Sequence, residues 1–198
     1  MFSILKKVLA VLIILAFATA TKSHGQQSLF RERHKWGFAL GYGEQAGLNV
    51  NYFYKVYQLQ YQYYFTLVGK EKWALEFLAQ PQFNFSRFKE INDSPTIIRG
   101  HEFGLNGGFL VRWILMNDRF SPYFFISAGP HYVSGVPERQ SPGFIFSDNF
   151  FSGMSIGLSD SFFLDLRFGF RHISNAGLQN PNGGVNNFVG NAGFFVAF

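Results

Sequence analysis

An alternation of apolar residues with small or polar residues is the dominant pattern along this chain. From Trp73 to Phe85 the odd positions carry Trp, Leu, Phe, Ala, Pro, Phe and Phe, and the even positions between them carry Ala, Glu, Leu, Gln, Gln and Asn. The same period of two runs through Phe103–Trp113 and Phe162–Phe170. Because successive side chains of a β-strand point to opposite faces, this pattern predicts strands with one apolar and one more polar face.

The alternation recurs in eight segments. We expect strands at about residues 35–43, 56–66, 73–87, 101–114, 121–132, 143–157, 161–174 and 187–198. Short and long connections alternate between them, as in outer-membrane barrels, whose periplasmic turns are short and whose extracellular loops are longer. Eight strands make the smallest common closed barrel. The sequence therefore predicts an all-β, eight-stranded antiparallel transmembrane β-barrel with both termini on the periplasmic side.

The N-terminal residues have the pattern of a secretory signal peptide. Lys6 and Lys7 precede the apolar run Val8–Ala18, and small residues follow it. The run is shorter than the about 20 residues that a membrane-spanning helix needs. We therefore expect a signal peptide over residues 1–25, cut near residue 20 or 25, and a single barrel domain over residues 26–198.

Composition strengthens the membrane interpretation over a soluble β-sandwich, which would also alternate. The 198 residues include 27 Phe and no Cys, so neither disulfides nor thiolate metal sites are available. Removing Lys6, Lys7 and Lys22 leaves 14 basic against 12 acidic residues, and this small net charge of +2 argues against nucleic acid as a partner. The aromatic C-terminus ending at Phe198 resembles the signal by which barrels reach the barrel-assembly machinery, and outer-membrane lipid is the expected surrounding.

A candidate site lies at the end of the seventh segment. His172 and Ser174 share parity with the apolar residues Leu166 and Phe168, so their side chains should reach the lipid-facing surface near its outer edge. A His two residues from a Ser on one face can accept the hydroxyl proton as the serine attacks an acyl carbon. The alternative is that polar residues stand there only because strand ends near lipid headgroups contact water.

The residues from Arg171 to Asn186 resemble a known active-site segment. His172–Gly177 reads HxSNAG and Asn180–Asn186 reads NPNxGxN, a run similar to that of the PagL-type lipid A 3-O-deacylases. These are outer-membrane barrels that remove the ester-linked acyl chain at the 3-position of lipid A.

The resemblance implies a role for each matched residue. Ser174 would be the nucleophile and His172 the general base, while Asn175 and the backbone around Gly177 would contribute to an oxyanion hole. The family places an acid twelve residues after the serine, and Asn186 stands there instead. An amide can orient the histidine but supplies no negative charge. The resemblance also implies lipid A or lipopolysaccharide as the partner, no cofactor, and an active site facing the outer leaflet of a Gram-negative outer membrane.

Strand register offers another acid. If a tight turn at Ser159-Asp160 joins the sixth and seventh strands, residues whose numbers add up to about 320 face each other, and Asp148 lies opposite His172. Asp148 could then orient the imidazole. It could equally cap a loop or pair with Arg171.

Charged residues fall into two expected groups. Five cations should lie near the extracellular rim, where they could bind lipid A phosphates or simply be solvated: Arg87, Lys89, Arg99, Arg139 and Arg171. Five charges should face inward and form a paired plug: Glu76, Glu102, Arg112, Asp165 and Arg167. Such a plug argues against transport, and the histidines His34, His101 and His131 lack metal-ligand spacing, so no metal is expected.

The predicted function is thus hydrolysis of a lipid A acyl ester by a serine–histidine mechanism. Two alternatives remain open at this level: a non-catalytic small outer-membrane barrel that keeps the motif without its acid, and a lipid esterase or phospholipase with another substrate. The sequence leaves open which acyl chain is cleaved and whether the protein forms a homodimer.

Overall fold

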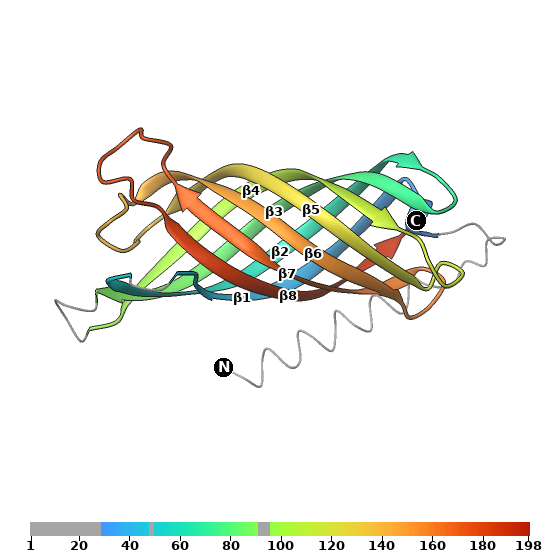
Figure 1. Ribbon diagram of the computed structural model, residues 1–198, viewed down its shortest axis with the longest axis horizontal. Helices are drawn as coiled ribbons and strands as arrows, with labels where there is room; N and C mark the ends of the chain where they lie inside the picture. The colour runs from blue at the N-terminus through green and yellow to red at the C-terminus, as the bar shows by residue number, and fades with distance from the viewer. Residues whose placement is uncertain (1–28, 48–49, 91–95) are drawn as a thin grey trace.

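The chain forms a closed β-barrel (Figure 1). The computed structural model describes residues 29–47, 50–90 and 96–198, so the predicted signal peptide lies outside the described residues. A short 3-10 helix precedes eight strands: η1 (Leu29–Arg31), β1 (His34–Gln45), β2 (Tyr52–Gly69), β3 (Trp73–Glu90), β4 (Ile98–Trp113), β5 (Phe120–Val133), β6 (Gly143–Gly157), β7 (Phe162–Ser174) and β8 (Val185–Ala197). No helix among these residues has the length and apolarity needed to span a membrane.

Each strand pairs antiparallel with the next, and β1 pairs with β8 to close the barrel. The prediction of eight strands in an antiparallel closed barrel is confirmed. Several strands run past the segments that the sequence indicates: β2 begins at Tyr52 and β3 continues to Glu90. Backbone pairing continues beyond the point where the alternation of apolar and polar residues ends. The pattern alone therefore predicts strands that are too short.

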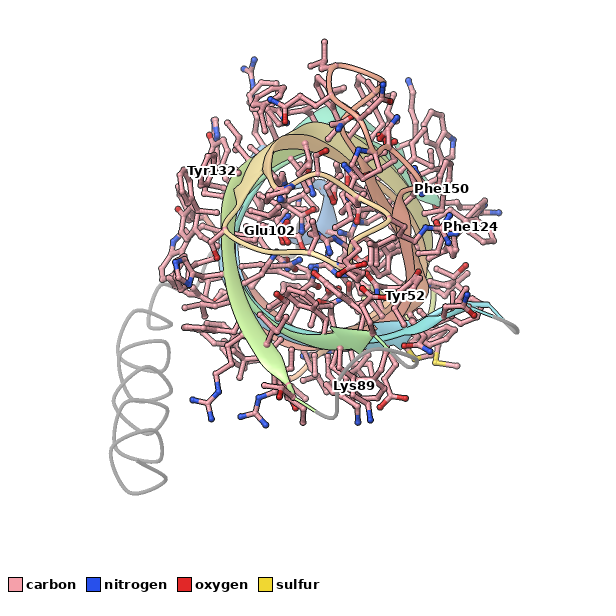
Figure 2. The ribbon with its side chains drawn as sticks, turned by 90° about the vertical axis from the view of Figure 1, so that its left-hand side faces the viewer. Tyr52, Lys89, Glu102, Phe124, Tyr132 and Phe150 are labelled. Carbon is pink, nitrogen blue, oxygen red and sulfur yellow. The ribbon has the colours of Figure 1, made fainter. Side chains whose placement is uncertain are left out.

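The outer wall is apolar and the interior is polar. Viewed along the barrel from its long-loop end, Phe124, Phe150 and Tyr132 project outward from the wall, whereas Glu102 lies within the ring of strands (Figure 2). Phe124 is 61% exposed and Glu102 is 2% exposed. Phenylalanines exposed over a whole wall would be unfavourable in water, whereas a lipid bilayer accommodates them, as in the outer-membrane barrels.

Buried ion pairs fill the interior near the short-turn end. Lys35 Nζ lies 2.9 Å from Glu76 Oε1, and Arg112 Nη2 lies 2.8 Å from Glu76 Oε2. Phe30 of η1 packs beneath them, with the Arg112 guanidinium 5.2 Å from its ring centroid. The helix η1 thereby closes this end of the barrel. At the same end Phe198 N donates to His34 O at 3.2 Å.

A second buried cluster fills the interior towards the long-loop end. The carboxylate of Glu102 pairs with Arg171 and with His131. Of the five charges expected to form a plug, all are buried, but only Glu76 and Arg112 pair with each other. Asp165 accepts instead from the hydroxyls of Tyr123 and Ser155. Side chains therefore fill the lumen, as eight-stranded barrels require.

Candidate active site

His172 and Ser174 lie two residues apart on the outer face of β7 at its long-loop end, and among the described residues no hydrogen bond joins their side chains. Along β7 the residues Asp165, Arg167, Arg171 and Ile173 are buried, whereas His172 and Ser174 are half-buried on the opposite face. Their outward orientation therefore agrees with the parity of the sequence pattern. The face below them is apolar, with Phe168 61% exposed. Two polar, reactive side chains thus stand at the upper edge of a lipid-facing surface.

Asn186 holds the imidazole from the neighbouring strand. In the β7–β8 register His172 lies opposite Asn186, and His172 Nδ1 lies 2.6 Å from Asn186 Oδ1. Because a carbonyl oxygen only accepts, Nδ1 carries the hydrogen of this bond, so the lone pair of the neutral imidazole is on Nε2. This is the tautomer in which a histidine acts as a base through Nε2.

Asp148 occupies the position that register predicts. The β6–β7 pairing sets Asp148 opposite His172 and Phe146 opposite Ser174. Directly opposite residues have their Cβ atoms about 4.5–5.5 Å apart, so the carboxylate is within reach of the imidazole. Among the described residues, however, no hydrogen bond or ion pair involves the Asp148 carboxylate, while Asn186 occupies Nδ1. Asp148 is a neighbour of His172 rather than its bonded partner.

The loop after Ser174 is held by its own side chains. Asn175 is 1% exposed; its Nδ2 donates to Gln179 O at 2.8 Å and its Oδ1 accepts from Gly177 N at 3.0 Å. Asn182 Oδ1 in turn accepts from Asn175 N at 2.9 Å. Gly177 has a φ of +81°, which suits glycine. These bonds give Asn175 and Gly177 a part in shaping the loop, and their role as oxyanion donors stays a prediction.

Gly184 is a site residue that sequence reasoning did not single out. Its φ is +64°, and a Cβ added there would lie 2.5 Å from His172 Cε1. Only glycine leaves room for the imidazole in this position. The Gly183-Gly184 pair within the motif was a visible signal, but the contact depends on the path of the loop between β7 and β8.

The β5–β6 loop braces this segment. Gln140 Oε1 accepts from Gly184 N at 3.1 Å, and Ser141 N donates to Pro181 O at 2.8 Å. Arg139 donates to Gly183 O and lies over the ring of Tyr52, 5.7 Å from its centroid. Of the five candidate phosphate-binding cations, Arg139 is the one whose contacts reach this loop.

The other four cations lie elsewhere. Arg171 is fully buried and pairs with Glu102 inside the barrel, so the interpretation of Arg171 as a rim cation is wrong. Its odd position on β7, opposite in parity to His172, places its side chain in the lumen. The remaining three, Arg87, Lys89 and Arg99, belong to β3 and β4. In the strand order β3 lies four strands from β7 in either direction and β4 lies three, so the barrel separates these cations from His172.

A metal centre has no support in this region. Among the described residues, no three His, Cys, Asp or Glu side chains gather closely enough to hold an ion. What the site offers chemically is a hydroxyl, a histidine in the base-competent tautomer and an apolar surface beneath them.

A comparison with known protein families shows which family this chain belongs to. The family model for lipid A 3-O-deacylase (PagL) matches residues 55–195, which is most of the barrel. The chain belongs to the PagL family. Its PagL match includes β7, the loop that follows it, β8 as far as residue 195 and every candidate catalytic residue.

Solved structures agree on the fold. The outer-membrane enzyme PagL superposes with a TM-score of 0.59 at 15% identity, covering 78% of this chain and 97% of that one. Neisserial surface protein A gives a TM-score of 0.53 at 14% identity, with coverage of 83% and 97%. Curated protein sequences gave no match. At these identities the structural likeness establishes an outer-membrane-type barrel, and the family match carries the link to PagL.

Proposed function

We propose that this protein is a lipid A 3-O-deacylase in which Ser174 and His172 perform the chemistry and Asn186 replaces the family's acid. The observation that supports it most is the bond between His172 Nδ1 and Asn186 Oδ1, at 2.6 Å, on the lipid-facing surface beside Ser174. That bond orients the imidazole where an acyl ester embedded in the membrane would lie.

The reaction proceeds in two steps. Ser174 Oγ attacks the carbonyl carbon of the ester while His172 Nε2 takes the hydroxyl proton. The tetrahedral intermediate collapses, the bond to the sugar oxygen breaks, and that oxygen receives the proton from the imidazolium. Water, deprotonated by His172, then attacks the acyl-serine and releases the fatty acid, which regenerates Ser174.

Lipid A as substrate requires the site to face the outer leaflet. The long loops stand at the same end of the barrel as Ser174, and both ends of the described chain lie at the other, which supports an extracellular orientation of the site. Arg139, beside the β7–β8 loop, is placed to contact a phosphate of the same lipid.

The proposal also includes a role for Asp148, the alternative acid opposite His172. It supports catalysis if it approaches the imidazolium once that cation forms, since the attraction is absent while His172 is neutral. The replacement of the family's acid by Asn186 is the observation that favours a non-catalytic barrel instead.

Mass spectrometry of lipid A from cells expressing the protein tests the proposal. We expect loss of one hydroxyacyl group with the wild type and intact lipid A with Ser174→Ala, both proteins being folded in the outer membrane by heat-modifiable mobility on gels. Unchanged lipid A with both proteins would favour the non-catalytic barrel. Release of fatty acid from phospholipids, with lipid A intact, would favour a phospholipase.

A further inference from the structure

Three cations form a row on the outer wall far from the catalytic pair. Lys55, Arg87 and Arg99 are directly opposite one another in the β2–β3 and β3–β4 registers, at the long-loop end. Arg87 and Arg99 are exposed, and Lys89 follows two residues beyond Arg87 on the same face. In Figure 2 Lys89 projects outside the wall. We call Lys55, Arg87 and Arg99, together with Lys89, the basic row.

Most of the charge in the basic row has no ion-pair partner among the described residues. Lys55 binds Glu44 at 2.8 Å, so its charge is balanced. Within the described part of the chain, no ion pair involves Arg87, Lys89 or Arg99. Like charges directly opposite each other on neighbouring strands destabilise a sheet. Arg87 and Arg99 face each other in this way, so their guanidinium groups repel each other. An anion bound between them would attract both groups and offset that repulsion.

An apolar surface continues from the basic row towards the middle of the barrel. The next outward pair on β3 and β4 is Phe85 with His101, followed by Phe83 with Phe103. An open groove of about 620 Å³ lies there, between Phe83, Phe103 and the neighbouring Leu59 and Leu105. It begins four residues from Arg87, which is about 13 Å along a strand. Cations above an apolar groove match an anionic lipid whose acyl chains lie along the wall.

We propose that the basic row binds the phosphate groups of a second lipid A molecule, which is not cleaved, with its acyl chains along the groove. Two guanidinium groups across a strand pair can each donate two parallel hydrogen bonds to a phosphate. A lipid at Ser174 cannot supply these phosphates, because β3 lies across the barrel from β7. The proposal rests on the orientation proposed above, with the long loops in the outer leaflet, and does not need catalysis.

Binding is measured on the full barrel carrying Ser174→Ala, so that no lipid is consumed. Native mass spectrometry in detergent micelles counts bound bis-phosphorylated lipid A. We expect Arg87→Gln/Arg99→Gln to bind one lipid fewer, with an apparent Kd for that lipid about tenfold weaker or more. Arg33→Gln/Arg119→Gln makes the same change of charge at the opposite end and should keep the count. Arg87→Lys/Arg99→Lys, which keeps the charge, should retain part of the affinity.

The lipid probes separate the sources of phosphate. Lipid A stripped of its phosphates should lose the same binding event, and millimolar inorganic phosphate should not displace the intact lipid. An unchanged count in Arg87→Gln/Arg99→Gln, or equal binding of dephosphorylated lipid A, would overturn the proposal. If the wild type fails to deacylate while Arg87→Gln/Arg99→Gln still loses one lipid, the deacylase proposal fails and this one stands.

Discussion

Replacing Asn186 by Asp should accelerate deacylation, because it restores a negative charge beside an imidazole that is already oriented. Asp and Asn have nearly the same shape, so the 2.6 Å bond from His172 Nδ1 can be kept. In serine proteases the change from acid to amide lowers kcat by about 10⁴, because the histidine takes the wrong tautomer. Here the amide oxygen already selects the right tautomer. The wild type therefore lacks only the electrostatic contribution of the acid, which is the attraction between a carboxylate and the imidazolium.

The size of that electrostatic part follows from distance and exposure. Two unit charges about 4 Å apart attract by about 1 kcal/mol in water and by about 4 kcal/mol at an effective dielectric constant of about 20. His172 is half-buried at the surface, so about 1–2 kcal/mol is the appropriate part of this range. Since each 1.4 kcal/mol or so changes a rate tenfold, Asn186→Asp should raise kcat by about 5- to 30-fold.

The assay is the initial rate of hydroxy fatty acid release from lipid A by refolded protein in detergent micelles. Each rate is normalised to the heat-modifiable, folded fraction. Asn186→Ala is the matched control and should lower the rate about tenfold or more, because the imidazole loses its orienting bond. If Asn186→Asp is no faster and Asn186→Ala keeps the wild-type rate, Asn186 does not orient His172, and the reasoning is refuted.

Three further changes test separate parts of the structure. Gly184→Ala should lower deacylation about tenfold or more in a folded barrel, because its Cβ would lie 2.5 Å from the imidazole; Gly143→Ala, also at positive φ but with open space around its Cβ, should not. Asp148→Asn should slow the same assay if that carboxylate stabilises the imidazolium, and a wild-type rate would exclude it. Glu76→Gln should lower the free energy of unfolding by about 3–5 kcal/mol, measured by urea titration in lipid vesicles, because two buried cations lose their carboxylate; an unchanged urea midpoint would contradict this ion-pair account.

The sequence alone determined which segments form the barrel wall and which of their side chains face outward. Period-two alternation identified all eight strands and the outward orientation of His172 and Ser174, because lipid outside and a packed lumen inside impose opposite demands on alternate residues. The position of Asp148 opposite His172 was also predicted from the sequence, from a tight turn at Ser159-Asp160, and the observed register agrees. The connection is longer than that turn, however: β6 ends at Gly157 and β7 begins at Phe162, and a strict two-residue turn would have set Asp148 opposite Arg171. The parity of Arg171 already pointed inward, and its assignment to the rim overlooked that signal.

The contacts that depend on the long loops and on the closure of the barrel were determined only by the tertiary structure. Asn186 meets His172 through a ten-residue connection whose register no local pattern fixes, and Gly184 contacts the imidazole only because of the path of that loop. Lys35 joins Glu76 across the lumen, a pairing that alternation within single strands cannot specify. Closure of β1 on β8 puts the basic row across the barrel from Ser174. Alternation reports which face a residue occupies, whereas the neighbours of a side chain across the barrel are set by how all eight strands close together.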